Sequence, residues 1–156
     1  MSRDALFRQA IAASGHTFDG EIKVGGNYVP LARDGNTIYL SGQIPRIGNE
    51  VVVRGRAGSD VTLAQAQVAA KICALRALAL LQRSLGSLDR IRTLLRITVY
   101  VHCTQDFTQH SEVADAASDL LHSILGSAGA HSRTSVGVYQ LPKNATVELD
   151  LIAAVD

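Results

Sequence analysis

The sequence predicts an α+β fold in which two helices cover one face of a sheet. Three observations indicate this class. An Ala- and Leu-rich run at 62–86 has the periodicity of a deeply packed helix, residues 91–103 alternate with the period of a strand, and a second helical run follows at 107–125. The element order is therefore strands, helix, strand, helix and two final strands.

Composition limits the classes of function. A chain of 156 residues with 47% hydrophobic residues corresponds to one domain, 1–156, with a core that needs neither disulfide nor metal. The two cysteines, Cys73 and Cys103, lack metal-ligand spacing, so we expect free thiols and no metal. A net charge of +1 does not favour nucleic acid or membrane surfaces. With no signal-peptide pattern and no uncharged span-length run, a cytoplasmic location is expected.

The first predicted element is a short helix near the N-terminus. Ser2 is placed to cap it, Leu6 and Phe7 begin its apolar face, and Gly15 follows its last turn. Residues 1–20 are therefore predicted to form a helical extension of the main fold.

Strands come next. Residues 28–31 and 37–44 have strand character, and the turn at 33–36 contains an Asp-Gly pair that tolerates the positive φ of a tight hairpin. Three consecutive valines at 51–53 predict a further short strand.

The helix at 62–86 carries the clearest boundary signals. Thr62 and Gln65 form a capping-box pattern, and Gly86 is a typical residue after a helix end. Its apolar residues cover more than one narrow stripe, so we expect deep packing. Arg76 is predicted to face water.

The two last strands flank a turn at 141–144, in which Pro and Asn are favoured. If they pair as a hairpin, Val136 faces Leu149 on an apolar face, and Arg133 and Glu148 lie on a polar face. In that register Arg133 and Glu148 are about 13 Å apart at strand rise. If the two residues share a site, either the strands do not pair in this way or a neighbouring subunit contributes one of them.

Three separated segments resemble the reactive intermediate deaminase (Rid, YjgF-type) family in order and spacing. They are Tyr28 followed by Ser-Gly-Gln-Ile-Pro at 41–45, the strand at 96–101 followed by Asp-Phe, and Arg133 followed by Leu-Pro at 141–142 and Val-Glu-Leu-Asp-Leu-Ile-Ala at 147–153. The resemblance covers the chain from about Tyr28 to Ala153.

The resemblance implies a chorismate-mutase-like fold with a mixed sheet, a homotrimer, and pockets between subunits. It also implies hydrolysis of enamines and imines, of the 2-aminoacrylate and 2-iminopropanoate type, to 2-oxo acids and ammonia. No cofactor is expected, and the implied partner is a small substrate that carries a carboxylate.

The family's functional residues fall on particular positions of this sequence. The resemblance assigns carboxylate binding to Arg133, water positioning to Glu148, and the pocket to Tyr28, Ser41 and Gly42. The residue types suit these roles, because a guanidinium grips a carboxylate with two parallel hydrogen bonds and a glutamate can carry a proton.

The sequence also departs from the family pattern beside the predicted anchor, and so resembles a divergent branch of the family. His131 stands where a proline is common, and Ser135 stands at the position of a frequent pocket cysteine. Both are candidate substrate-binding residues, and His131 is a candidate proton carrier because histidine titrates near neutral pH.

Two other functions stay open at this point. A basic patch of Arg46, Arg54 and Arg56 would suit RNA, although nucleic acid is disfavoured because only 4% of the residues are aromatic and no stacking platform is evident. Alternatively, a non-catalytic trimer could bind a small carboxylate metabolite through Arg133 without using Glu148.

Overall fold

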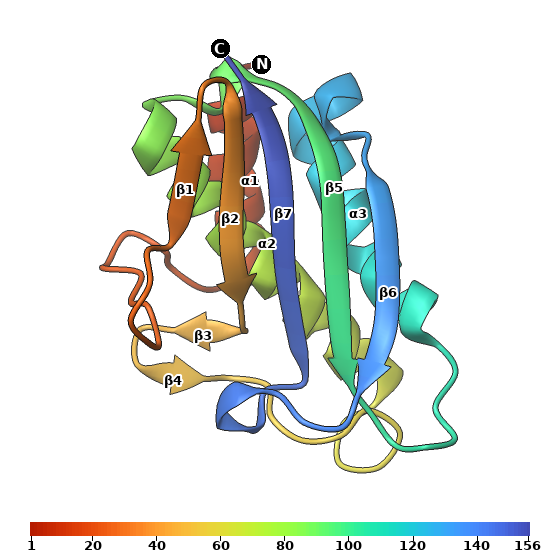
Figure 1. Ribbon diagram of the computed structural model, residues 1–156. Helices are drawn as coiled ribbons and strands as arrows, with labels where there is room; N and C mark the ends of the chain where they lie inside the picture. Colours follow the sequence, from red (N-terminus) through yellow and green to blue (C-terminus); the bar gives the residue numbers. More distant parts are fainter.

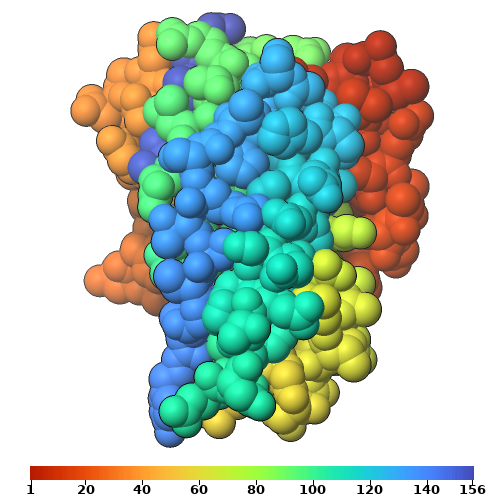
Figure 2. Space-filling model, turned by 90° about the vertical axis from the view of Figure 1, so that its right-hand side faces the viewer, coloured from red at the N-terminus to blue at the C-terminus, as the bar shows by residue number.

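The computed structural model describes all 156 residues as three layers (Figures 1 and 2). A five-stranded sheet forms the first layer, two helices pack on one of its faces, and the N-terminal helix lies outermost. The helices are α1 (Arg3–Ser14), α2 (Leu63–Leu85) and α3 (His110–Leu125), with short 3₁₀ turns at Leu88–Arg90, Gly126–Gly129 and Pro142–Asn144. The main sheet contains β1 (Leu31–Asp34), β2 (Thr37–Gln43), β5 (Ile91–His102), β6 (Ser132–Val138) and β7 (Val147–Val155), and β3 (Arg46–Ile47) pairs with β4 (Glu50–Val51) as a separate ribbon.

The predicted α+β class and the boundaries of the helix at 62–86 are confirmed, whereas the helix predicted at 107–125 begins later, at His110, after a turn. The Ser2 hydroxyl accepts a hydrogen bond from the Ala5 amide at 3.1 Å and so caps α1. At α2, the reciprocal capping box between Thr62 and Gln65 is formed, and the helix ends at Gly86 with φ of 84°. These local signals define the helices because they satisfy backbone groups that no helical partner reaches.

The sheet order β1-β2-β7-β5-β6 corrects the predicted hairpin of the last two strands. β5 lies between β6 and β7, parallel to β6 and antiparallel to β7 (Figure 1). The physical reason is that α3 connects β5 to β6 as a crossover, which places the two strands parallel and adjacent. The chain then passes beneath β5 before it begins β7.

This topology moves the β6 side chains to the face opposite the predicted one. Arg133 pairs with Ile97, a fully buried residue under the helices, whereas Val136 pairs with Tyr100 on the open face. Since Tyr100 also pairs with Glu148 of β7, Arg133 and Glu148 lie on opposite faces of the sheet. The prediction that one polar face carries both residues is wrong.

The core lies between the sheet and the two inner helices. α2 is long and apolar enough to cross a membrane by length and composition, but 67% of the apolar window is buried in the protein, as expected for a central core helix. The largest fully buried side chains come from all layers and include Phe7, Ile38, Ile72, Leu78, Ile97, Leu121 and Ile124.

No helix covers the other face of the sheet. Tyr39 and Val136 are 52% and 38% exposed there, and the Tyr100 hydroxyl donates a hydrogen bond to Asp150 at 3.1 Å. Large hydrophobic side chains beside partly satisfied polar ones are typical of a surface that another molecule covers.

Candidate functional site

A cavity of about 220 Å³ opens where β2 ends and β7 begins. It brings together three of the residues singled out in the sequence, Tyr28, Gly42 and Glu148. Gly42 lies within an irregularity of the β2–β7 pairing between Leu40 and Gln43, where the strand bulges. Such bulges re-aim backbone and side chains next to sites.

The missing side chain of Gly42 makes room for the Glu148 carboxylate. A Cβ atom at position 42 would lie 2.7 Å from Oε2 of Glu148 and 2.8 Å from its carboxylate carbon, which is closer than a real Cβ contact. Any larger residue would therefore displace the carboxylate from this position. The glycine of the Ser-Gly motif is thus required because only a residue without a side chain leaves space for this carboxylate.

The Glu148 side chain makes no hydrogen bond or ion pair within the chain. Burial raises the pKa of its carboxyl group, and the nearby charge of Asp150 raises it further. A carboxyl group that is half-buried, unpaired and raised in pKa is suited to give and take a proton during a reaction.

Ser41 does not line the cavity, but it hydrogen-bonds to the segment that forms one side of it. The Ser41 hydroxyl donates to the Val29 carbonyl at 2.8 Å, and the Ser41 amide donates to the Pro30 carbonyl at 2.9 Å. These bonds tie the segment that carries Tyr28 to the end of β2. Ser41 therefore positions Tyr28 beside the cavity.

Arg133 lies elsewhere, at the start of the edge strand β6. Its Nη1 atom donates to Asp115 at 2.8 Å and to the Ser118 hydroxyl at 3.0 Å, both on α3. The Nε and Nη2 atoms make no hydrogen bond within the chain, and the side chain is 22% exposed. One edge of the guanidinium is held while the other edge remains open to an anion.

His131 belongs to the same network. Its Nδ1 atom lies 2.6 Å from the Gly129 carbonyl, and its Nε2 atom lies 2.9 Å from the Ser118 hydroxyl. Burial lowers the pKa of His131, and the nearby His122 and Arg133 act in the same direction against the Gly129 bond. A neutral ring with its proton on Nδ1 satisfies both contacts, so His131 orients Ser118 and, through it, Arg133.

Ser135 follows on the same strand, in register with Val99 and on the helix-covered face with Arg133. The sequence-predicted residues therefore form two groups. Tyr28, Gly42 and Glu148 line the cavity, supported by Ser41; a separate group of Arg133, Ser135 and His131 lies two strands away.

Four cationic residues of the cavity, Lys23 among them, were missed or misassigned from the sequence. Arg46 and Lys143 line it beside Glu148, and so does Arg76, which is 4% exposed rather than turned to water. The prediction for Arg76 is wrong because strand β3, which begins at Arg46, packs against this turn of α2: Nη1 of Arg76 donates to the Arg46 carbonyl at 2.6 Å. The sequence signal that could have indicated its burial is that Arg76 is surrounded by alanines and leucines in the chain.

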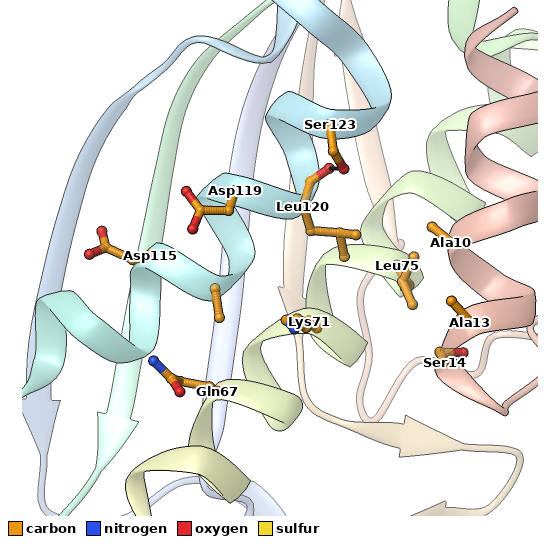
Figure 3. A pocket seen from close by; sticks show the side chains of 11 residues that line it. Ala10, Ala13, Ser14, Gln67, Lys71, Leu75, Asp115, Asp119, Leu120 and Ser123 are labelled. Atoms are coloured by element: carbon orange, nitrogen blue, oxygen red, sulfur yellow. Dashed lines mark hydrogen bonds between the residues drawn. The ribbon is translucent and has the colours of Figure 1, made fainter. Parts of the chain in front are cut away.

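A larger cavity of about 510 Å³ lies between the three helices, on their side away from the sheet (Figure 3). Leu75 and Leu120 lie toward Ala10 and Ala13 of α1, whereas Asp115 points away from α1. This groove contains no histidine, cysteine or arginine, and Asp115 is already paired with Arg133. The chemistry therefore favours the smaller cavity at Glu148.

The fold and site define a small α+β protein with a polar cavity at strand ends. Residues 9–155 match the family model described as "YjgF/chorismate mutase-like, putative endoribonuclease", and the chain belongs to this family. The expected YjgF-type, chorismate-mutase-like fold and the resemblance to a divergent branch of the family are thereby confirmed.

Individual relatives agree. The crystal structure of Agrobacterium tumefaciens protein Atu1372 is 35% identical with a TM-score of 0.88, covering 99% of this chain and 95% of that one. A "putative endoribonuclease" from Shewanella oneidensis is 30% identical with a TM-score of 0.88, covering 96% and 99%. Protein TCP17 of Trypanosoma cruzi is 39% identical over 127 residues, 81% of this chain and 79% of that protein.

Proposed function

We propose that this protein is a cytoplasmic, single-domain homotrimer that hydrolyses small 2-imino acids to 2-oxo acids and ammonia. The observation that carries the proposal is Glu148, an unpaired carboxyl group with a raised pKa in a small polar cavity. The substrates expected are of the 2-aminoacrylate and 2-iminopropanoate type.

The chemistry requires water and a proton carrier, both of which suit this cavity. Glu148 takes a proton from water as the water oxygen attacks the imine carbon, and the nitrogen is protonated in turn. The carbon–nitrogen bond of the resulting amino alcohol then breaks as the hydroxyl loses its proton, which leaves a 2-oxo acid and ammonia. The imine and one water account for all atoms, so no metal or organic cofactor is required.

Arg133 of a neighbouring subunit is the proposed anchor of the substrate carboxylate. Its open Nε and Nη2 edge presents the geometry of a bidentate carboxylate contact, and Asp115 and Ser118 hold the other edge. The uncovered sheet face with Tyr39 and Val136 supports an assembly that would bring Arg133 of one chain to Glu148 of another.

A coupled assay tests the proposal. A serine dehydratase generates 2-aminoacrylate, and release of the 2-oxo acid is followed with and without this protein. Wild type and the exposed control variant Arg54→Ala should accelerate release, whereas Arg133→Ala should lose at least about tenfold in kcat/KM because a charge-assisted contact is removed. No acceleration by wild type, or equal acceleration by Arg133→Ala, rejects the proposal.

Gly42→Ala should preserve the fold and lower activity. The added methyl group would meet the Glu148 carboxylate, so we expect kcat to fall about tenfold or more, since small displacements of a catalytic group are costly. Thermal unfolding followed by circular dichroism checks the fold, and the coupled assay measures the loss. Ser111→Ala, on the exposed start of α3, is the control variant. Gly35→Ala is unsuitable as a control, because the positive φ of Gly35 would strain an alanine. Unchanged kcat would contradict the steric role of Gly42.

RNA cleavage is the second candidate, favoured by the endoribonuclease description of the family and of the Shewanella relative. The three arginines of the predicted basic patch line different cavities, and Arg56 is engaged with the Tyr139 ring and the His102 side chain. RNA cleavage that survives purification and falls in Arg54→Ala and Arg56→Ala would support this function.

Carboxylate binding without turnover is the third candidate. Its support is the open edge of the Arg133 guanidinium, which does not depend on Glu148. If wild type binds a small 2-oxo acid in calorimetry, Arg133→Ala abolishes binding, and no imine is hydrolysed, this function replaces the deaminase proposal.

A further inference from the structure

The Glu148 cavity contains more positive charge than the proposed reaction explains. Four cationic residues line it together with a single carboxyl group, Glu148: they are Lys23, Arg46, Arg76 and Lys143. One cation on the neighbouring subunit would suffice to hold the carboxylate beside the imine carbon. The cations of the cavity itself are therefore available to bind a second anionic group.

Arg76 is the most deeply placed of them. It is 4% exposed on the middle of α2, and its Nε atom donates to the Gln43 side chain at 3.3 Å. Its Nη1 atom donates a hydrogen bond to the Arg46 carbonyl, while its Nη2 atom has no hydrogen-bond partner within the chain. Burial lowers the pKa of Arg76, but guanidinium groups remain protonated in proteins, so a full positive charge is held here.

Arg46 adds a second incompletely paired guanidinium. Its Nε atom is buried and makes no hydrogen bond. No carboxylate oxygen lies within 4.0 Å of Arg46, Arg76 or Lys143, since the only ion pair in the chain is Arg133 with Asp115. Asp19 and Glu21 line an adjoining cavity on the other side of Arg46 and Arg76 without reaching either of them.

A buried cation without counter-charge is costly, so the buried Arg76 and the buried Nε atom of Arg46 favour a site in which a ligand supplies the anion. Glu148 does not fill this role, because no oxygen of its carboxyl group lies within 4.0 Å of a cationic nitrogen. The cavity volume of about 220 Å³ equals that of about seven waters, enough for a small organic acid.

We infer that the Arg46–Arg76 pair binds a second carboxylate, so that the preferred substrates are 2-imino dicarboxylic acids. This inference rests on the proposed deaminase function. Arg133 of the neighbouring chain takes the carboxylate beside the imine carbon, Glu148 handles the proton, and Arg46 and Arg76 take the acidic side chain. Lys143 contributes positive charge at the cavity wall.

The experiment compares two imino acids made in place by amino-acid oxidases, one from aspartate and one from alanine, in the presence of the full-length protein. Wild type should favour the dicarboxylate by about tenfold or more in kcat/KM, since an ionic contact to a buried arginine discriminates strongly. Arg46→Met should remove this preference, lowering kcat/KM about tenfold or more for the dicarboxylate and less than about threefold for the other substrate. Arg54→Met, an exposed arginine outside the cavity, should retain it.

The outcomes separate the two ideas. If wild type hydrolyses both imino acids with equal efficiency, or if Arg46→Met loses activity on both alike, the second carboxylate site is overturned while the deaminase function stands. If neither is hydrolysed, the deaminase function fails. Calorimetry with 2-oxoglutarate and 2-oxobutanoate then tests the second carboxylate site on its own. If the site exists, wild type binds the dicarboxylate more tightly than the monocarboxylate, and Arg46→Met loses that preference.

Arg76→Met is a second variant for the same test. Because Arg76 is buried, its replacement is accepted only where circular dichroism shows a folded protein, and Arg46→Met keeps the inference testable if it does not fold. Loss of the dicarboxylate preference in folded Arg76→Met supports the pair as one site, and full retention contradicts it.

Discussion

Replacing Glu148 with Gln is expected to remove imine hydrolysis and, at the same time, to stabilise the fold at neutral pH. The loss in kcat should be about 10²- to 10⁴-fold, the range for removal of a general acid–base group. Glutamine keeps the shape and hydrogen-bonding capacity of the side chain but carries no titratable proton.

The stability effect follows from the direction of the pKa shift. Burial raises the pKa of Glu148 in the folded state above its unfolded value, so the folded state binds the proton more tightly. Below the unfolded pKa of about 4.3 both states are protonated, and Glu148 adds no pH dependence. As pH rises from there through the folded pKa, the carboxyl group must ionise in the cavity, and wild type loses stability that Glu148→Gln retains.

Thermal unfolding at pH 4 and pH 8 measures this difference. The melting temperature of Glu148→Gln should exceed that of wild type at pH 8 by more than it does at pH 4. Glu112→Gln, an exposed residue on α3, should show no such pH dependence. An equal offset at both pH values, or wild-type turnover by Glu148→Gln, would contradict the role given to Glu148.

The sequence predicted the helices and the long strand β5 well because their signals are local. The strand predicted at 28–31 is displaced to β1 at Leu31–Asp34, and of the strand predicted at 51–53 only Val51 lies in a strand, β4. The capping box at Thr62 and Gln65 and the alternation of β5 depend on neighbours within a few residues. The family motifs identified Gly42 and Glu148, which the structure brings into contact although 106 positions separate them, 148 minus 42.

Non-local pairing was the part that the sequence left undetermined. β6 alternates small, polar and apolar residues, so either of its faces could be the inner one, and only the parallel register with β5 places Arg133 under α3. The burial of Arg76 likewise depends on strand β3, which begins at Arg46, thirty positions away along the chain. Neither contact leaves a pattern within its own element.

Mixing two inactive variants is expected to restore activity. Within one chain, the strand positions of Arg133 and Glu148 differ by three rows and two strand spacings, a backbone separation of about 14 Å, and the side chains lie on opposite faces. A small substrate cannot bridge them around the sheet. If both act in one reaction, the Arg133 that serves a given Glu148 belongs to another chain.

Arg133→Met chains keep Glu148, and Glu148→Gln chains keep Arg133, so each variant alone lacks one half of every site. In a cyclic oligomer assembled at random from equal amounts, about one interface in four combines the two intact halves. Co-expressed variants with different affinity tags should therefore regain about a quarter of wild-type kcat, with KM near that of wild type, while a mixture of separately purified oligomers that do not exchange subunits should stay inactive. Light scattering on the same samples establishes that the tags were purified as one assembly. Activity that remains absent in proven mixed oligomers would mean that Arg133 and Glu148 do not act in a shared site, and the anchor of the substrate carboxylate would then have to be sought among the cations already present in the Glu148 cavity.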